Sequence, residues 1–122
     1  PMSKAFSKDF IKNHKEGLEK DKEKLLHQIS ELKKEDPFMD PNHAIDNAAI
    51  DTDVREQVGH DTIQAQIKDL QRKLHDIELA FEKITKGRYG QCEKCGVQIP
   101  VARINLIPEA RFCIECEQKL YR

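Results

Sequence analysis

Four cysteines carry the clearest metal-binding chemistry of this sequence, and all of them lie in the last third of the 122-residue chain. They form two Cys-x-x-Cys pairs, Cys92 with Cys95 and Cys113 with Cys116, separated by seventeen residues. Two such pairs can bring four thiolates to one tetrahedral ion, and zinc is the usual occupant. The spacing therefore predicts one structural Zn²⁺ that takes part in folding. Because all four ligands would be sulfur, no position remains open for catalysis by the metal.

Redox-active pairs and disulfides are the two other interpretations of these cysteines. Thioredoxin-like pairs accompany a βαβ pattern, which is missing around both pairs. Disulfides are rare in a reducing compartment. We expect such a compartment, because the sequence shows neither a secretory signal nor the roughly 18 apolar residues of a membrane span. The sequence thus predicts a soluble, cytoplasmic protein with a metal site.

Two long helices are expected to position the cysteine segment. Hydrophobic residues make up 38% of the chain and charged residues 35%, with only 5 Gly and 5 Pro, which favours long helices over a thick globular core. Apolar residues follow one another at alternating steps of four and three from Ile63 to Ile84, a pattern typical of a coiled-coil seam. A weaker seven-residue repeat runs from Ile11 to Leu32. We expect helices from about residue 8 to 34 and from about residue 41 to 86.

The segment between these helices contains two Asp-Pro steps, which the first helix cannot cross unbroken. Asp40 is expected to cap the second helix, with Pro41 in its first turn. Because a short connector makes neighbouring helices antiparallel, this arrangement places Leu25 opposite the region of His60. A homodimeric coiled coil is the alternative, and it fits the proline-containing connector less well, so we expect a monomer.

The predicted fold class is mainly α, a long antiparallel coiled-coil hairpin followed by a small C4 zinc-finger module. Residues 2–86 would form the hairpin, with its tip at about residues 35–56. Residues 87–122 would form the finger.

Charge is segregated along the chain although the net charge is only −1. Residues 1–34 hold nine basic and six acidic side chains, and residues 57–122 hold eleven and nine. Residues 35–56 hold one base and seven acids, which are Glu35, Asp36, Asp40, Asp46, Asp51, Asp53 and Glu56. Acids at a helix N-terminus offset the macrodipole, which would account for Asp40 alone. Seven acids exceed what capping requires, so we expect an acidic tip suited to a positively lined or Mg²⁺-containing cavity.

The cysteine segment closely resembles the C4 zinc finger of the DksA/TraR family. The resemblance rests on YGQCEKCGVQI at residues 89–99, on Arg103-Ile104, on Pro108-Glu109-Ala110 and on CIEC at residues 113–116. In that family the finger follows a long antiparallel coiled coil. The resemblance implies a bacterial, non-enzymatic regulator that binds RNA polymerase directly. It would insert the coiled-coil tip into the secondary channel without contacting promoter DNA.

The resemblance also implies residues of the tip. Family members carry an Asp-x-x-Asp-x-Ala pattern that acts near the active centre of the polymerase. Asp46 and Ala48 match the second half of this pattern, whereas His43 stands in place of the first Asp. The site residues implied for the tip are Asp46 and Ala48, together with the further acids Asp40, Asp51 and Asp53.

Binding of the alarmone guanosine tetraphosphate is left open by the resemblance. Family members that respond to it use basic residues at the finger and the coiled coil. Glu117 and Asp76 fill two of those positions here. Arg72, Lys73 and Lys83 remain on the second helix, and as isolated charges we expect them to be solvated. The five histidines are scattered singly, and we expect them at the surface or at the edge of the seam.

Two other functions compete with the polymerase regulator. A zinc-ribbon protein that binds nucleic acid would need a strong basic footprint, whereas residues 86–122 hold seven basic and four acidic side chains. A transcript-cleavage factor of the polymerase would use the acidic tip to assist hydrolysis.

Overall fold

Two long α-helices, two short ones and one 3₁₀ turn make up the described part of this computed structural model, which covers residues 6–39 and 50–120. The elements in chain order are α1 (Lys8–Glu35), the short 3₁₀ helix η1 (Pro37–Met39), α2 (Ile50–Thr85), α3 (Val101–Leu106) and α4 (Ile114–Leu120). The mainly α fold class is confirmed, and α1 begins and ends within a residue of its predicted bounds. The predicted start of the second helix, at Asp40 and Pro41, lies outside the described residues. Among the described helices, none has a stretch long and apolar enough to cross a membrane.

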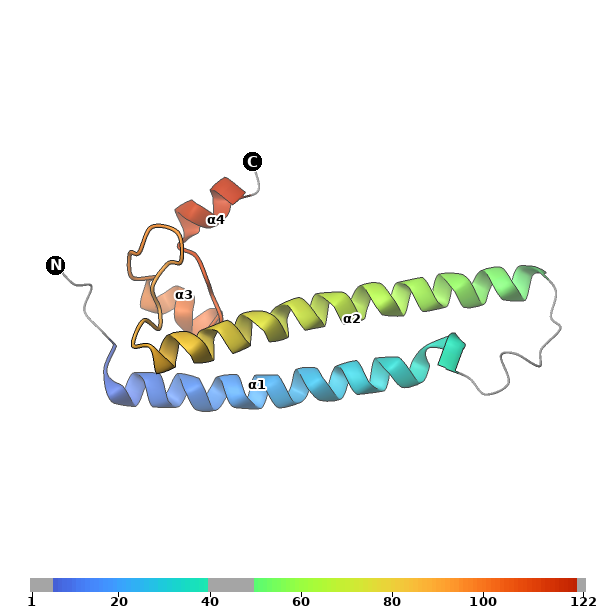
Figure 1. Cartoon of the computed structure of the whole chain (residues 1–122), viewed down its shortest axis with the longest axis horizontal. Helices are drawn as coiled ribbons and strands as arrows, with labels where there is room; N and C mark the ends of the chain where they lie inside the picture. The colour runs from blue at the N-terminus through green and yellow to red at the C-terminus, as the bar shows by residue number, and fades with distance from the viewer. Residues whose placement is uncertain (1–5, 40–49, 121–122) are drawn as a thin grey trace. The chain divides into compact units, whose positions relative to one another are not determined.

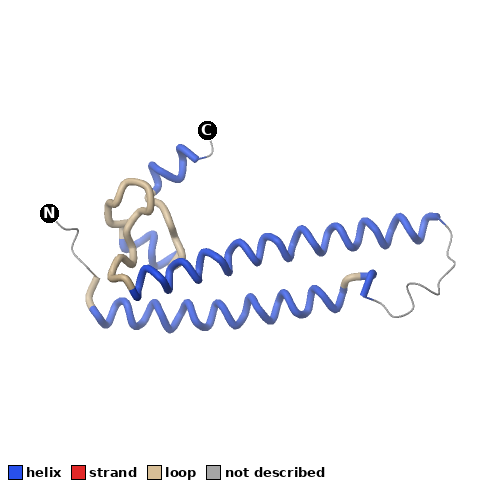
Figure 2. The backbone as a smooth tube through the Cα atoms, in the orientation of Figure 1, coloured by secondary structure: helices blue, strands red, loops and turns tan. Residues whose placement is uncertain are grey.

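The chain divides into two compact units. Unit 1 comprises Pro1–Lys22 and Lys73–Arg122, and unit 2 comprises Glu23–Arg72. Each long helix contributes to both units, and the loops of the cysteine segment belong to unit 1 (Figure 2). The domain boundary between residues 86 and 87 stays a prediction.

Unit 2 consists of two antiparallel helical arms whose register differs from the expected one. The side chains of Leu25, Ile29 and Ile67 are buried between them. The expectation that Leu25 lies opposite His60 is wrong, because His60 hydrogen-bonds Asp36, eleven residues further along the chain. A seam that repeats every seven residues fixes which faces meet but not how far the arms slide, so the repeat alone could not give this register.

Asp36 is a buried carboxylate at the end of α1, only 5% exposed. Its oxygens accept hydrogen bonds from His60 Nδ1 at 2.7 and 2.9 Å, from Phe38 N at 2.9 Å and from Gln64 Nε2 at 3.3 Å. The ring of Phe38 stacks on the ring of His60 at 4.2 Å. Burial raises the pKa of Asp36, but the hydrogen bonds outweigh burial and leave this pKa below its ordinary value. Asp36 is therefore a structural latch of unit 2, although the sequence counts it among the seven acids expected at the tip.

Unit 1 packs the first turns of α1 and the last turns of α2 together with the cysteine segment. Its buried side chains include Leu18 of α1, Ile77 of α2, and Ile99 and Ile104 of the cysteine segment. All four are fully enclosed, so one small core joins the helix ends to the segment.

An aromatic cluster extends this core toward the N-terminus. The rings of Phe6 and Phe10 lie 4.4 Å apart, and Phe10 stacks on His14 at 4.0 Å. Phe6 also meets the ring of Tyr89 edge-on at 6.1 Å. His14 Nδ1 donates to the carbonyl of Phe10, and its Nε2 lies 2.9 Å from Oδ1 of Asn105 in α3. His14 is therefore an internal tie of unit 1, which its isolated place in the sequence did not indicate.

Gly90 is required where this cluster meets the first cysteine pair. Its φ of +84° lies in the left-handed region that favours glycine. A Cβ atom at this position would also lie 2.1 Å from Cε2 of Phe6. The ring of Phe6 thus closes over this turn, a contact between residues 84 positions apart that no local sequence pattern marks.

Replacing Asp36 with Asn should lower the thermal stability at neutral pH, because the buried amide cannot replace the carboxylate as acceptor of all four hydrogen bonds. Since the folded pKa of Asp36 is lowered, the stability it contributes is complete above its unfolded pKa of 3.8 and is lost as pH falls through the folded value. The difference in Tm between wild type and Asp36→Asn should therefore shrink below about pH 4. Circular dichroism melts check this, with the exposed neighbour variant Glu35→Gln as control. A difference that stays constant down to about pH 3 would contradict the ionised latch.

Two glycine-to-alanine variants should move stability in opposite directions. Gly90→Ala should destabilise the chain by about 1–3 kcal/mol, because a left-handed backbone and the ring of Phe6 both oppose the new methyl group. Gly17 lies inside α1 with nothing within 4 Å of a built Cβ, so Gly17→Ala should stabilise the chain by roughly 0.5–1 kcal/mol. Urea unfolding measures both, and equal midpoints for the two variants would refute the close approach of Phe6.

Candidate metal centre

Tight turns around the first cysteine pair hold it in position. Cys92 N donates to the carbonyl of Val97 at 2.8 Å, and Gly96 N donates to the carbonyl of Cys92 at 3.0 Å. Gly96, which follows the pair, has a φ of +80° in the left-handed region that favours glycine. The backbone thus folds into a knuckle that turns the side chains of Cys92 and Cys95 to the same side.

The second pair lies at the start of α4. Cys113 immediately precedes this helix, and its carbonyl accepts a hydrogen bond from Glu117 N at 2.9 Å. Cys116 follows in the first turn and is buried, as is Cys92 of the first pair. One short helix therefore fixes both ligands of the second pair.

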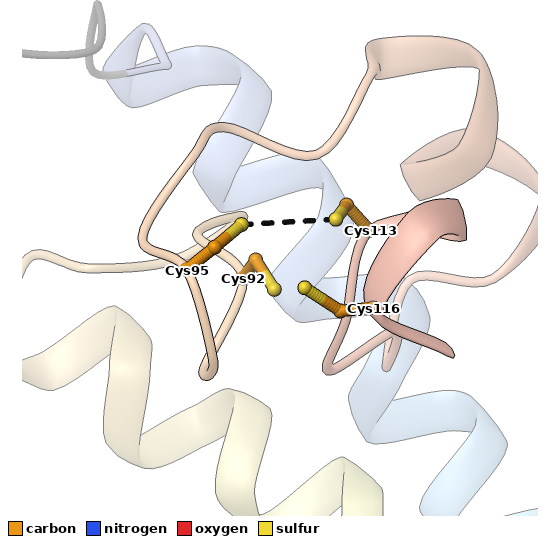
Figure 3. Close-up of side chains that lie close together, drawn as sticks. All are labelled: Cys92, Cys95, Cys113 and Cys116. Carbon is orange, nitrogen blue, oxygen red and sulfur yellow. Dashed lines mark hydrogen bonds between the residues drawn. The ribbon is translucent and has the colours of Figure 1, made fainter. Parts of the chain in front are cut away.

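The four sulfur atoms converge on one point (Figure 3). All of them lie within 4.8 Å of one another, and the sulfur atoms of Cys95 and Cys113 are 3.8 Å apart. A tetrahedral zinc ion with Zn–S bonds of about 2.3 Å requires sulfur atoms about 3.8 Å apart. None of the four cysteines is in a disulfide. The donor set fits one structural zinc ion.

The charge on the sulfurs explains why the group needs a cation. Burial raises the pKa of Cys92, but hydrogen bonds from backbone N–H groups, that of Cys95 first among them, outweigh burial and lower this pKa. Hydrogen bonding with Cys113, followed by burial, raises the pKa of Cys116. The pKa of the Cys92 thiol is therefore lowered, whereas the pKa of the neighbouring Cys116 thiol is raised. A divalent cation would let all four ionise together, since a thiol that coordinates zinc is deprotonated.

Arg111 clamps the two halves of the site together. Its guanidinium donates to both carboxylate oxygens of Glu93 at 3.0 Å, and its carbonyl accepts from Glu93 N at 2.9 Å. It also lies 3.7 Å from the carboxylate of Asp76 on α2 and over the ring of Phe112. Hydrogen bonds from Arg111 lower the pKa of Glu93 against the effect of burial. The residue after Cys92 is thus tied to the residue two before Cys113.

Lys83 extends this clamp, which corrects the expectation that it is a solvated charge. Its ammonium lies 3.3 Å from Glu93 and donates to the carbonyl of Gln91 at 3.0 Å, and its side chain is only 16% exposed. On the other side of the site, Arg103 of α3 pairs with Glu117 of α4 and donates to the carbonyl of Phe112. The partners of Arg103 and Arg111 were not predicted, because no local pattern marks an ion pair whose two residues are distant in the chain.

The residues implied for the tip are described only in part. Asp40, Asp46 and Ala48 lie outside the described residues. Asp51 lies in the first turn of α2, where the backbone alone is described, and the side chain of Asp53 is exposed on the same helix. Their role in function stays a prediction.

Metal analysis should find about one zinc per chain, with no thiol reactive before denaturation.

The variant Arg111→Gln should lose zinc to a chelator several-fold faster than the wild type, because the substitution removes the ion pair that joins the first knuckle to the second. Arg88→Gln is the matched control, since Arg88 is exposed and forms no ion pair with the described residues. A zinc-free protein with a reducible disulfide would rule out the metal centre, and equal release rates would rule out the clamp.

Comparison with known proteins identifies this metal centre. Residues 87–122 match the family described as prokaryotic dksA/traR C4-type zinc finger. General stress protein 16O of Bacillus subtilis (strain 168) is 30% identical over 103 residues, which cover 83% of this chain and 56% of that protein. RNA polymerase-binding transcription factor DksA of Escherichia coli (strain K12) is 35% identical over 57 residues, 46% of this chain and 38% of that protein. The aligned part of the chain thus spans little more than half of the first relative and less than half of the second.

A solved structure shares the fold. Transcription factor DksA2 from Pseudomonas aeruginosa superposes with a TM-score of 0.78, covering 94% of this chain and 85% of that one, at 19% sequence identity. The cysteine set, the family match and this fold agree with the resemblance found in the sequence. The chain therefore belongs to the DksA/TraR family of C4-type zinc-finger proteins.

Proposed function

We propose that this protein is a cytoplasmic, non-enzymatic transcription regulator that binds RNA polymerase as a monomer. The hairpin tip would enter the secondary channel of the polymerase and modulate initiation, and the zinc finger would hold the base of the hairpin. The observation that carries this proposal is the family match of the finger on a chain with the DksA fold. The name of the Escherichia coli relative, RNA polymerase-binding transcription factor, supplies the partner.

The described chemistry of the finger supports a structural rather than a catalytic role. Four cysteine ligands would leave zinc without an open position for water. The clamp formed by Arg111, Glu93 and Lys83 further fixes the knuckles in place. We therefore infer that the finger supports the hairpin and performs no chemistry.

The charged side chains near the finger argue against binding of the alarmone guanosine tetraphosphate, so we infer that binding to the polymerase does not depend on it. Asp76 and Glu117, which replace basic residues of the family, line one pocket of about 290 Å³ in unit 1. Two arginines share this pocket, and each is already paired with a carboxylate, Arg103 with Glu117 and Arg111 with Asp76. A polyphosphate would have to break these pairs and approach the two acids. We infer that this pocket does not bind the alarmone.

Retention on core RNA polymerase tests the proposal directly. The zinc-loaded chain should be retained by immobilised core polymerase in the absence of DNA. Salt-sensitive binding to DNA without polymerase would instead support the zinc-ribbon nucleic-acid binder. Cleavage of the transcript in backtracked complexes would support the cleavage factor, and Asp46→Asn should then abolish the activity.

Replacing Asp46 with Ala should leave the affinity for core polymerase nearly unchanged and reduce the effect on transcription. The physical reason is that a carboxylate at the tip would act on the charged interior of the channel, whereas the rest of the hairpin and the finger would supply the binding contacts. Affinity by competition with a known secondary-channel factor and transcription in vitro are the two measurements. Asp61→Ala is the control, an exposed acid on α2 beyond the acidic tip. Loss of affinity in Asp46→Ala would show that the tip is an anchor instead.

A further inference from the structure

A groove on the flank of unit 2 has no role in the proposed function so far. This flank groove has a volume of about 510 Å³ and is lined by residues of the last turns of α1 and the middle of α2. Leu32 of α1 and Leu70 of α2 supply its aliphatic lining, and both side chains are only half-buried. Two packed helices bury the side chains of the seam between them and leave a groove along each side of that seam exposed. Such a groove has the shape to hold a third helix.

Acidic side chains surround this aliphatic pair. Glu31 and Glu35 lie on the α1 side and Asp69 on the α2 side, and no Lys or Arg lines the groove. Glu31 pairs with Lys34 at 3.2 Å and Asp69 pairs with Arg72, but these side chains are between 51% and 76% exposed. Exposed pairs of this kind are weak, so basic groups of a partner can replace them. His27, Gln28 and Gln66 complete the lining, so the flank groove is an aliphatic strip bordered by carboxylates and other polar side chains.

The three acidic side chains of the flank groove indicate which kind of molecule could bind in it. Nucleic acid is disfavoured, because its phosphates would face three carboxylates. A second copy of this chain is disfavoured too, since a two-fold interface would place Glu31, Glu35 and Asp69 against the same three acids. A helix with apolar residues on one face and basic residues beside them matches both the strip and its rim.

We propose that the flank groove docks a basic amphipathic helix of a protein partner. Apolar side chains spaced three and four residues apart would pack on Leu32 and Leu70, and Lys or Arg residues would pair with the carboxylates. The inference rests on the proposed function only for the identity of the partner, which is then a helix of RNA polymerase. The flank of the hairpin would supply affinity, whereas the tip would supply the effect.

A labelled peptide tests the groove without polymerase. The probe is a synthetic helix with leucines at positions i, i+4 and i+7 and lysines elsewhere, titrated with the full zinc-loaded chain by fluorescence anisotropy. The variant Glu31→Lys/Asp69→Lys reverses two exposed charges of the groove without touching the buried seam. Glu19→Lys/Glu78→Lys reverses two exposed charges on the same helices outside the groove. Leu70→Gln tests the aliphatic strip, with circular dichroism confirming that the helices remain.

The groove variant should weaken peptide binding at least about tenfold, while the control variant changes it less than about twofold. Leu70→Gln should also weaken binding. Equal affinities of the groove and control variants would overturn the proposal, because the peptide would then sense only the net charge. A wild-type dimer in analytical ultracentrifugation that the groove variant dissolves would overturn it as well, since the occupant would be a second copy.

The same variants on core polymerase separate this inference from the proposed function. If the wild type binds polymerase and the groove variant binds at least about tenfold more weakly, both stand. If the two bind polymerase equally, the flank groove is not the contact, although the proposed function survives. If the wild type does not bind polymerase, the proposed function is wrong, and the partner of the flank groove is then not a helix of the polymerase.

Discussion

Four sulfur atoms within 4.8 Å of one another are the constraint on which the finger depends. Thiolates this close repel one another, so the group is stable in its ionised form only around a cation. The segment between the pairs contributes the buried side chains of Ile99 and Ile104. These two residues belong to the same core as Leu18 and Ile77 of the long helices. Closing the metal site and packing the helix ends of unit 1 are therefore parts of one folding event.

The ion pairs around the site make this coupling specific. Arg111 reaches Glu93 in the first knuckle and Asp76 on α2, and Lys83 reaches Glu93 from the same helix. A bidentate arginine–carboxylate pair fixes an orientation as well as a distance. The first knuckle therefore has a defined position relative to the last turns of α2 within unit 1. A finger held by zinc alone would keep its own shape but could turn on its attachment to the helix.

Some parts of this structure follow from the sequence and others do not. The bounds of α1, the end of α2 and the C4 site follow from short-range signals, namely apolar spacing, the Asp-Pro steps and the spacing of Cys92, Cys95, Cys113 and Cys116. The partners of Asp36 and Arg111 do not, because His60 and Glu93 are distant in the chain and nothing local marks them. Residues 86–122 hold four acids, Glu93, Glu109, Glu115 and Glu117, and nothing in the sequence shows that Glu93 is the one whose carboxylate meets Arg111 at both oxygens. Identifying such pairs requires the fold.

The latch in unit 2 shows how a thin hairpin acquires one register. An apolar seam with a seven-residue repeat loses little burial when one arm slides by one heptad. Asp36 satisfies its buried carboxylate only where His60 and Gln64 lie opposite, four residues apart on one face of α2. A slip by seven residues would leave that carboxylate buried without these partners, and an unsatisfied buried carboxylate costs more free energy than the small change in burial along the seam. One buried polar group therefore decides which residues of α1 and α2 face each other within unit 2.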